Sequence, residues 1–245
     1  MARPRHLSNA PITEALIDLQ VKLPADIGVE TLKSGHELIS TNYPQVLERR
    51  KWASQLQLSK GKPPTQVTSE AGPDGYFFIS PDRKQMVQYR LDGFTFNRFK
   101  PYETWESLRD ETFRLWEIYL RIASPEVITR VALRYINHLQ FPLPIADFHL
   151  YLNAPPDVPG QLPHFVTSFL TRVVIVDSST GAAANISQVL ESISEGKVML
   201  DIDVFKGTQF RAVANDAWDL LNSLRDLKNR IFFESVTDQT LRLYE

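Results

Sequence analysis

The chain has 245 residues, of which 43% are hydrophobic and 23% are charged, and its formal net charge at pH 7 is −2. This balance is typical of a folded globular protein and excludes an intrinsically disordered one. Without an overall positive charge, non-specific nucleic-acid binding is disfavoured as its main task. The absence of cysteine excludes disulfides, thiolate catalysis and zinc sites with sulfur ligands.

No apolar run of the sequence approaches the ~20 residues that a helix needs to cross a bilayer. The start of the chain is basic, but the apolar core of a signal peptide does not follow it. We therefore expect a cytoplasmic location and no membrane partner, in keeping with the missing cysteines.

The first predicted element is a strand over 12–23, where apolar and polar residues alternate. Pro24 ends this strand, and Asp26 can cap a helix over about 28–41. Pro44 breaks or restarts that helix.

A second alternation occupies 54–59, and the turn-forming residues of 60–75 predict a loop. A β-meander should follow, with Asp92-Gly93 as a two-residue hairpin turn. Its strands are expected at 76–80, 85–91 and 94–99. Apolar residues at helical spacing then predict a helix over about 104–122, and the longest strand covers 126–141.

Pro142 and Pro144 mark a joint, which divides the chain into a first half, 1–143, and a second half, 144–245. The second half begins with a short segment and a proline-rich loop, and it continues with strands and helices. Strands are expected at 165–177, 183–192 and 197–205, a helix at 215–233 capped by Asn215 or Asp216, and a last short helix from Thr237.

The order of elements is β-α-β-βββ-α-β in the first half and βββ-α-α in the second. Each half contains a three-strand run followed by a long helix that begins near a tryptophan. We therefore predict an α+β fold of two similar halves, each an antiparallel sheet with long helices packed on one face, with a ferredoxin-like or split βαβ tendency. The two sheets could also be continuous, and the chain would then be one domain.

Several segments together resemble a sporadically distributed bacterial family whose members have a similar length. They are "NAPITEALIDLQ", the meander followed by "YETWESL", "LRYIN", and the C-terminal "IFFESVTDQTLRLYE". The chain departs from the family where a basic residue is expected after "RYIN", because His138 stands there. The resemblance implies an intact bacterial member of this family and implies no catalytic residues.

Polar side chains lie within the long strand 126–141. Arg130, Arg134 and His138 share one face of it, which is either the solvated side of an antiparallel sheet or a basic binding surface. Arg90 and Arg98 of the meander could lie on the same side. Arginines on a rigid sheet, beside phenylalanines, suit a phosphate or carboxylate attached to a flat ring.

The neighbouring Asn137 points to the apolar face of the same strand, and we expect its amide to bond to backbone groups.

Three aspartates suggest a different chemistry. Asp18, Gln20 and Lys22 have a spacing related to the Glu-x-Glu-x-Lys of triphosphate-tunnel enzymes, with one acid replaced by Gln20. Asp201 and Asp203 lie two apart on one strand face, where they could bind Mg²⁺. A solvated strand face accounts for the same residues. The sequence contains no HExxH, P-loop, GxGxxG or GxSxG motif.

Three functions remain open. The leading hypothesis is a non-enzymatic cytoplasmic binding or interaction protein without a cofactor, whose basic face contacts an anionic small molecule or protein partner. The second is a metal-dependent enzyme acting on phosphate esters or triphosphates, with Mg²⁺ held by Asp18, Asp201 and Asp203. The third is a structural subunit of a larger complex, which an exposed edge strand or apolar patch would favour. Homo-oligomer formation is open in each case.

Overall fold

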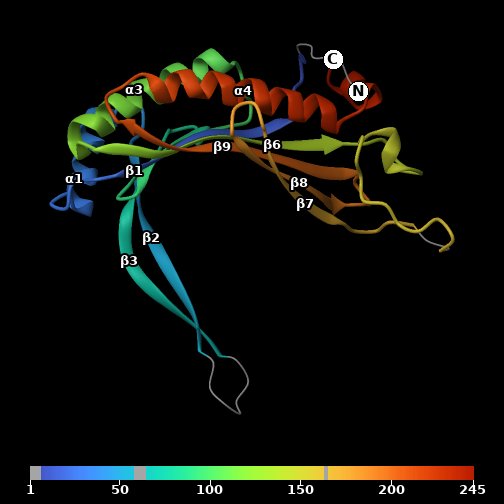
Figure 1. Cartoon of the computed structure of the whole chain (residues 1–245), viewed down its shortest axis with the longest axis horizontal. Helices are drawn as coiled ribbons and strands as arrows, with labels where there is room; N and C mark the ends of the chain where they lie inside the picture. The colour runs from blue at the N-terminus through green and yellow to red at the C-terminus, as the bar shows by residue number, and fades with distance from the viewer. Residues whose placement is uncertain (1–6, 58–64, 163–164) are drawn as a thin grey trace.

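The strands form one nine-stranded sheet in the order β2-β3-β4-β5-β1-β6-β9-β8-β7, with every neighbouring pair antiparallel (Figure 1). This computed structural model describes residues 7–57, 65–162 and 165–245, with 52–57 and 65–71 described by their backbone alone. The strands are β1 Ile12–Lys22, β2 Gln45–Gln57, β3 Thr65–Ile79, β4 Gln85–Arg90, β5 Gly93–Phe99, β6 Val127–Gln140, β7 Leu170–Val176, β8 Ala183–Ser192 and β9 Lys197–Arg211.

The prediction of two similar halves, each with its own helix-covered sheet, is wrong. β6 pairs with β1 along one edge and with β9 along the other, and the second pairing runs from Val127 opposite Arg211 to Gln140 opposite Lys197. Because β9 pairs along the whole of β6, no sheet edge separates the two parts of the chain. The division into 1–143 and 144–245 as domains stays a prediction, although the sheet passes across it.

Helices α3 and α4 lie along one face of the sheet (Figure 1). The opposite face is open between the β2–β3 hairpin, which projects from the sheet, and β7. Among the described residues, no helix is long and apolar enough to cross a bilayer. The helices are α1 Val29–Ser34, α2 His36–Ile39, α3 Trp105–Ala123, α4 Asp216–Ser235 and α5 Asp238–Leu241, with 3-10 turns at Phe148–Leu150 and Arg242–Tyr244.

The core lies between the sheet and α3 and α4. In β1 the alternation seen in the sequence buries Ile17 and Leu19 completely, because every second side chain of a strand faces the helices. Phe94 of β5 packs edge-on against Trp116 of α3, with ring centroids 5.6 Å apart. Burying such large side chains contributes about 1.5–3 kcal/mol each, which anchors α3 on the sheet.

Two local predictions in the first half also need correction. The expected loop 60–75 is strand from Thr65 onward, and its earlier residues 60–64 lie outside the described residues. The turn formers are accommodated inside the hairpin, where Gly72 has a φ of 87° and the β2–β3 register shifts twice. The single helix expected over 28–41 is divided into α1 and α2 at Gly35.

Candidate functional site

The open face of the sheet gathers Arg90, Arg130, Arg134 and His138, but it does not include Arg98. Arg98 stands opposite Ala15, which is fully buried beneath the helices. Directly opposed residues of an antiparallel pair share a face, so the prediction that Arg98 lies with the others is wrong. On the helix side, its Nη1 donates to Glu103 at 3.0 Å.

Asp18 is the centre of a charge network on the open face. Its Oδ1 accepts a hydrogen bond from Arg90 Nη2 at 2.8 Å, and its Oδ2 accepts one from Arg130 Nη1 at 3.2 Å. Arg130 Nη2 also donates to Asp203 at 3.3 Å. The two arginines and two aspartates balance in charge, and all four side chains are mostly buried. Removing one member would leave a poorly solvated charge without a partner.

Arg134 and His138 are engaged as well. The Arg134 guanidinium donates to both carboxylate oxygens of Asp201, at 2.8 and 2.6 Å, and these bonds raise the pKa of Arg134. His138 Nδ1 lies 2.7 Å from Thr13 Oγ1, and its Nε2 lies 3.2 Å from Glu191 Oε1. The predicted basic surface is therefore a row of matched ion pairs, with little positive charge left for an external anion.

The same contacts bear on the magnesium hypothesis. Asp18 and Asp203 both accept hydrogen bonds from Arg130, which links them, and Asp201 accepts from Arg134. Their carboxylate oxygens thus face guanidinium groups, and the described residues place no group of three or more His, Asp or Glu side chains where they could hold a metal ion.

Asn137 behaves as the sequence predicts. It is buried, and its Nδ2 donates to the carbonyl oxygen of Leu200 on β9 at 3.0 Å. The amide thus ties β6 to β9 on the helix side of the sheet, and it reaches the floor of a cavity there.

This cavity has a volume of about 460 Å³ and lies between the start of α3, the middle of α4 and the sheet. Its walls combine aromatic side chains with two cations, and residues 7–12 close one side. The lining residues include Tyr102, Trp105, Glu106, Tyr135, Arg225, Lys228 and Phe232.

Lys228 is the unusual member of the cavity wall. It is only 9% exposed, and its Nζ lies 3.8 Å from the centroid of the Tyr135 ring. Among the described residues, no acidic side chain forms an ion pair with it. Burial, with a further contribution from the nearby Arg225 charge, lowers the pKa of Lys228 to about 7. A buried lysine in such surroundings is partly uncharged at neutral pH.

The groups around Lys228 add donors and one more cation. Arg225, three residues earlier on α4, lies over the Trp105 ring, with its Cζ 5.5 Å from the ring centroid. It too has no acidic partner within the described part of the chain. The hydroxyls of Tyr102 and Tyr135 are 2.9 Å apart. The start of α3, where Thr104 caps the helix, turns the positive end of a 19-residue helix toward the same cavity.

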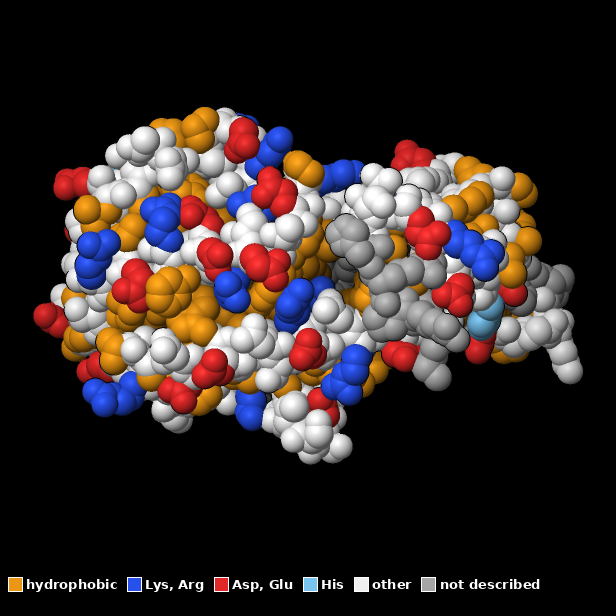
Figure 2. All heavy atoms as spheres, turned by 90° about the horizontal axis from the view of Figure 1, so that it is seen from above, with side chains coloured by type: hydrophobic (Ala, Val, Ile, Leu, Met, Phe, Trp, Pro, Cys, Tyr) orange, Lys and Arg blue, Asp and Glu red, His pale blue; other side chains and the backbone are white. Residues whose placement is uncertain are grey.

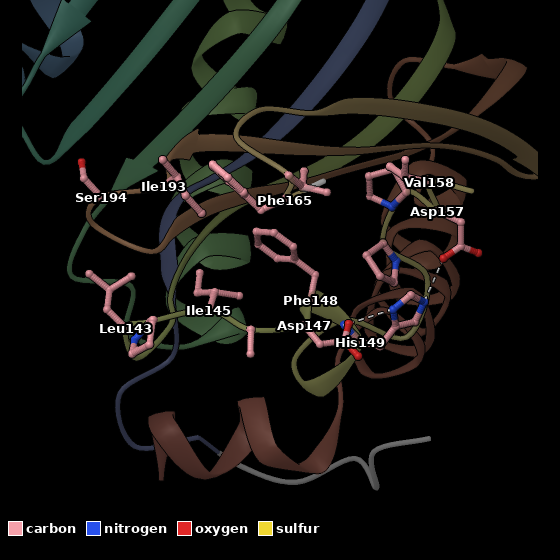
Figure 3. Close-up of a pocket in the computed structure, with 15 residues that line it drawn as sticks. Leu143, Ile145, Asp147, Phe148, His149, Asp157, Val158, Phe165, Ile193 and Ser194 are labelled. Atoms are coloured by element: carbon pink, nitrogen blue, oxygen red, sulfur yellow. Dashed lines mark hydrogen bonds and ion pairs between the residues drawn. The ribbon is translucent and has the colours of Figure 1, made fainter. Parts of the chain in front are cut away.

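A larger cavity of about 730 Å³ lies beyond the end of β6, around His149 (Figure 3). His149 Nδ1 is 3.0 Å from Asp147 and its Nε2 is 3.2 Å from Asp157, so both ring nitrogens are occupied. Ser194 lies on the opposite side of the cavity from His149, and its hydroxyl contacts Ser192 Oγ at 3.2 Å. The walls come mostly from loop segments, which position side chains less rigidly than helices and strands.

The helix-covered face offers no strong alternative anion site. On the helix-covered face, Lys and Arg side chains intermingle with Asp and Glu, and no patch of one sign stands out (Figure 2). The Lys228 cavity therefore has the better claim to be the functional site, because its rigid elements hold a buried lysine and a partly buried arginine, neither with an acidic partner among the described residues.

The sequence contains a pattern that singles out Lys228, although no catalytic or binding motif includes this residue. Residues 217, 221, 224 and 231 form the apolar stripe of α4, and position 228 falls on that same stripe. A lysine within a buried stripe is unusual, since lysine is almost never fully buried without a partner.

Comparison of the chain with protein-family models finds no match, and searches of curated proteins and of solved structures return none either. The resemblance to the sporadic bacterial family stays a prediction.

Proposed function

We propose that this is a cytoplasmic binding protein that holds a small organic anion, a carboxylate with an apolar or aromatic body, in the Lys228 cavity. The observation that carries the proposal is a buried lysine without an acidic partner in an aromatic-lined cavity. A buried unpaired charge is costly, so a bound carboxylate would stabilise the protonated amine. This proposal keeps the predicted anionic ligand but moves it from the open sheet face to the helix side.

The dimensions and chemistry of the cavity suit such a ligand. A volume of about 460 Å³ lies within the usual range for small-molecule sites. Trp105 and Phe232 supply apolar surface for the body of the ligand, and Arg225 supplies a second cation beside Lys228. The hydroxyls of Tyr102 and Tyr135 can orient a carboxylate oxygen.

Binding can be tested with 3-phenylpropionate and, as a matched uncharged ligand, 3-phenylpropionamide. Isothermal titration should detect binding of the carboxylate to the wild type and at least about tenfold weaker binding of the amide. Lys228→Met should weaken carboxylate binding by a similar factor. Lys33→Met is the matched control, because Lys33 also lies over a tyrosine ring, that of Tyr76, but on the exposed surface. Equal affinity of Lys228→Met and the wild type would overturn the proposal, as would no binding of the carboxylate.

A second candidate function rests on β7, the edge strand next to β8. Leu170 and Val176 are 73% and 67% exposed, and Val173 and Val174 are more than half exposed. The outer edge of β7 has no strand partner among the described residues. The strand itself contains neither lysine nor proline. Natural edge strands usually carry such protection against pairing, so this edge favours the third hypothesis, a subunit that assembles with another chain.

We propose that the occupant of this edge is β7 of a second copy. In an antiparallel self-pair centred on Val173, Leu170 stands opposite Val176 and Val173 stands opposite its own copy, so apolar side chains meet. The one charged residue of the strand, Arg172, already donates to Asn185. Sedimentation equilibrium should show a dimer for the wild type and a monomer for Val174→Lys. A monomeric wild type at about 100 μM would refute this assembly.

A further inference from the structure

We infer that the amine of Lys228 captures the carbonyl group of its ligand as a Schiff base, and that the ligands are 2-oxo acids with an apolar or aromatic body. This inference rests on the proposed function, since it names the reaction of the same cavity. It goes further because it assigns a covalent role to a particular nitrogen atom.

The placement of the two cations on α4 suits a 2-oxo acid. Such a ligand carries its carboxylate directly beside its carbonyl group. Arg225 and Lys228 are three residues apart, so their side chains are neighbours on one side of the helix, and both line the cavity. Arg225 can hold the carboxylate while Nζ of Lys228 reaches the adjacent carbonyl carbon. Trp105, beneath Arg225, lies where the apolar body would pack.

The surroundings of Lys228 also leave its nitrogen available as a nucleophile. No carboxylate among the described residues pairs with it, and the Tyr135 ring contacts it through a π face that cannot accept a proton. Desolvation in an apolar pocket next to another cation is an established way to activate a lysine amine.

The charges of the groups that face Lys228 bear on its protonation near neutral pH. Burial lowers the pKa of Lys228 to about 7, so about half of the amines are neutral there, against roughly one in 3,000 at the ordinary lysine pKa of 10.5. Arg225, on the same helix, opposes protonation. Burial raises the pKa of Tyr102 and of Tyr135, so both stay neutral. Two carboxylates lie on the cavity wall. Glu103 accepts hydrogen bonds from Arg98 and Ser107, and the side chain of Glu106 is exposed, so that solvent screens its charge.

The reaction is a balanced condensation. The lone pair of Lys228 Nζ attacks the carbonyl carbon, a carbon–nitrogen bond forms, and the carbonyl oxygen leaves as water with the two hydrogens of the amine. Nothing is oxidised or reduced, and no further reactant is required.

Trapping with phenylpyruvate and sodium cyanoborohydride tests the inference on the full chain. Intact mass spectrometry of the wild type should show one reduced adduct per chain, and peptide mapping should place it on Lys228. Lys228→Met and Lys228→Arg should lose at least about nine-tenths of the adduct, while Lys33→Met should retain it. Adducts spread over surface lysines, or equal labelling of Lys228→Met, would overturn the inference. Thermal melts of each variant establish that it is folded.

Two further measurements separate this inference from the proposed function. If 3-phenylpropionate binds in a Lys228-dependent way but phenylpyruvate gives no adduct, the Schiff base is overturned and the binding function stands. If neither compound binds or reacts, both are overturned. Under saturating phenylpyruvate, the rate of trapping should rise about tenfold from pH 6 to pH 8 as the amine loses its proton. A steady rise continuing to pH 10 would instead indicate an ordinary exposed lysine and contradict the inference.

Discussion

Replacing Lys228 by methionine keeps an unbranched, flexible side chain that is one atom shorter and removes the buried amine, so Lys228→Met reports mainly the energetic effect of that one charge. The pKa of Lys228 is about 7 in the folded protein, against 10.5 for an ordinary lysine. At about 1.4 kcal/mol for each pKa unit, protonating the buried amine lowers the free energy of unfolding by about 5 kcal/mol at most. Removing Nζ also removes its contact with the Tyr135 ring. Losing that contact costs about 1–2 kcal/mol and offsets part of the stability gained by removing the charge.

The effect has a definite pH dependence. Between pH 7 and pH 10.5 the unfolded chain binds a proton at Lys228 that the folded chain does not, so the stability of the wild type rises with pH. Below pH 7 both states are protonated and the full cost is present. We therefore expect Lys228→Met to be more stable than the wild type at pH 6, by about 3–4 kcal/mol. The difference should shrink by about 1.4 kcal/mol for each pH unit between 7 and 9.

Urea unfolding followed by far-UV circular dichroism at pH 6, 7, 8 and 9 measures this difference. Other groups that titrate in the same range are common to both proteins and cancel in the comparison. Lys33→Met serves as the control and should show a constant difference from the wild type. If the difference between Lys228→Met and the wild type is the same at pH 6 and pH 9, or if the variant is less stable at pH 6, Lys228 is not a desolvated amine.

The remaining predictions concern binding, the ion pairs and one turn. The affinity for 3-phenylpropionate should fall by up to about tenfold per pH unit above 7, because the carboxylate prefers protonated Lys228; a pH-independent titration would contradict this. Arg134→Ala should lower the free energy of unfolding by about 1 kcal/mol, since it leaves Asp201 unpaired, and an unchanged urea midpoint would show that this half-exposed pair contributes nothing. Gly196→Ala should cost about 2–3 kcal/mol, because φ is 68° there and a Cβ would lie 2.3 Å from the Phe141 carbonyl oxygen; an unaltered melting temperature would refute that packing.

Much of the local structure was predictable because it depends on neighbouring residues. The alternation over 12–23 corresponds to β1, and a tight hairpin joins β4 to β5 as expected. Its two turn residues are Leu91 and Asp92, not Asp92 and Gly93, because Gly93 already pairs with Arg90 as the first residue of β5. The turn formers of 65–75 misled, since glycine and proline can also occur where a paired strand bulges. The backbone hydrogen bonds of this segment come from the pairing of β3 with β2. Such pairing between strands is not visible in a short window of sequence.

The candidate site was harder to predict because it depends on register and on partners. Which face Arg98 occupies follows from its position opposite Ala15 across two separate strands. The acidic partners of Arg130 and Arg134 come from β9 and, for Arg130, also from β1. By contrast, Lys228 was visible as a charged residue within an apolar stripe, although only the structure places Tyr135 beneath it.

The position of β6 inside the sheet, between β1 and β9, has a consequence for how the chain acquires its structure. Thr13 bonds to the carbonyl of Ile136, 123 residues away, and Asn137 bonds to that of Leu200, 63 residues away. Contacts of such long sequence separation slow folding, because a large loop must close before they form. During synthesis on the ribosome, the edge of β6 that pairs with β9 remains unpaired until β9 emerges. Chains stopped before residue 197 should therefore aggregate, and chaperones that recognise exposed strand edges should bind them.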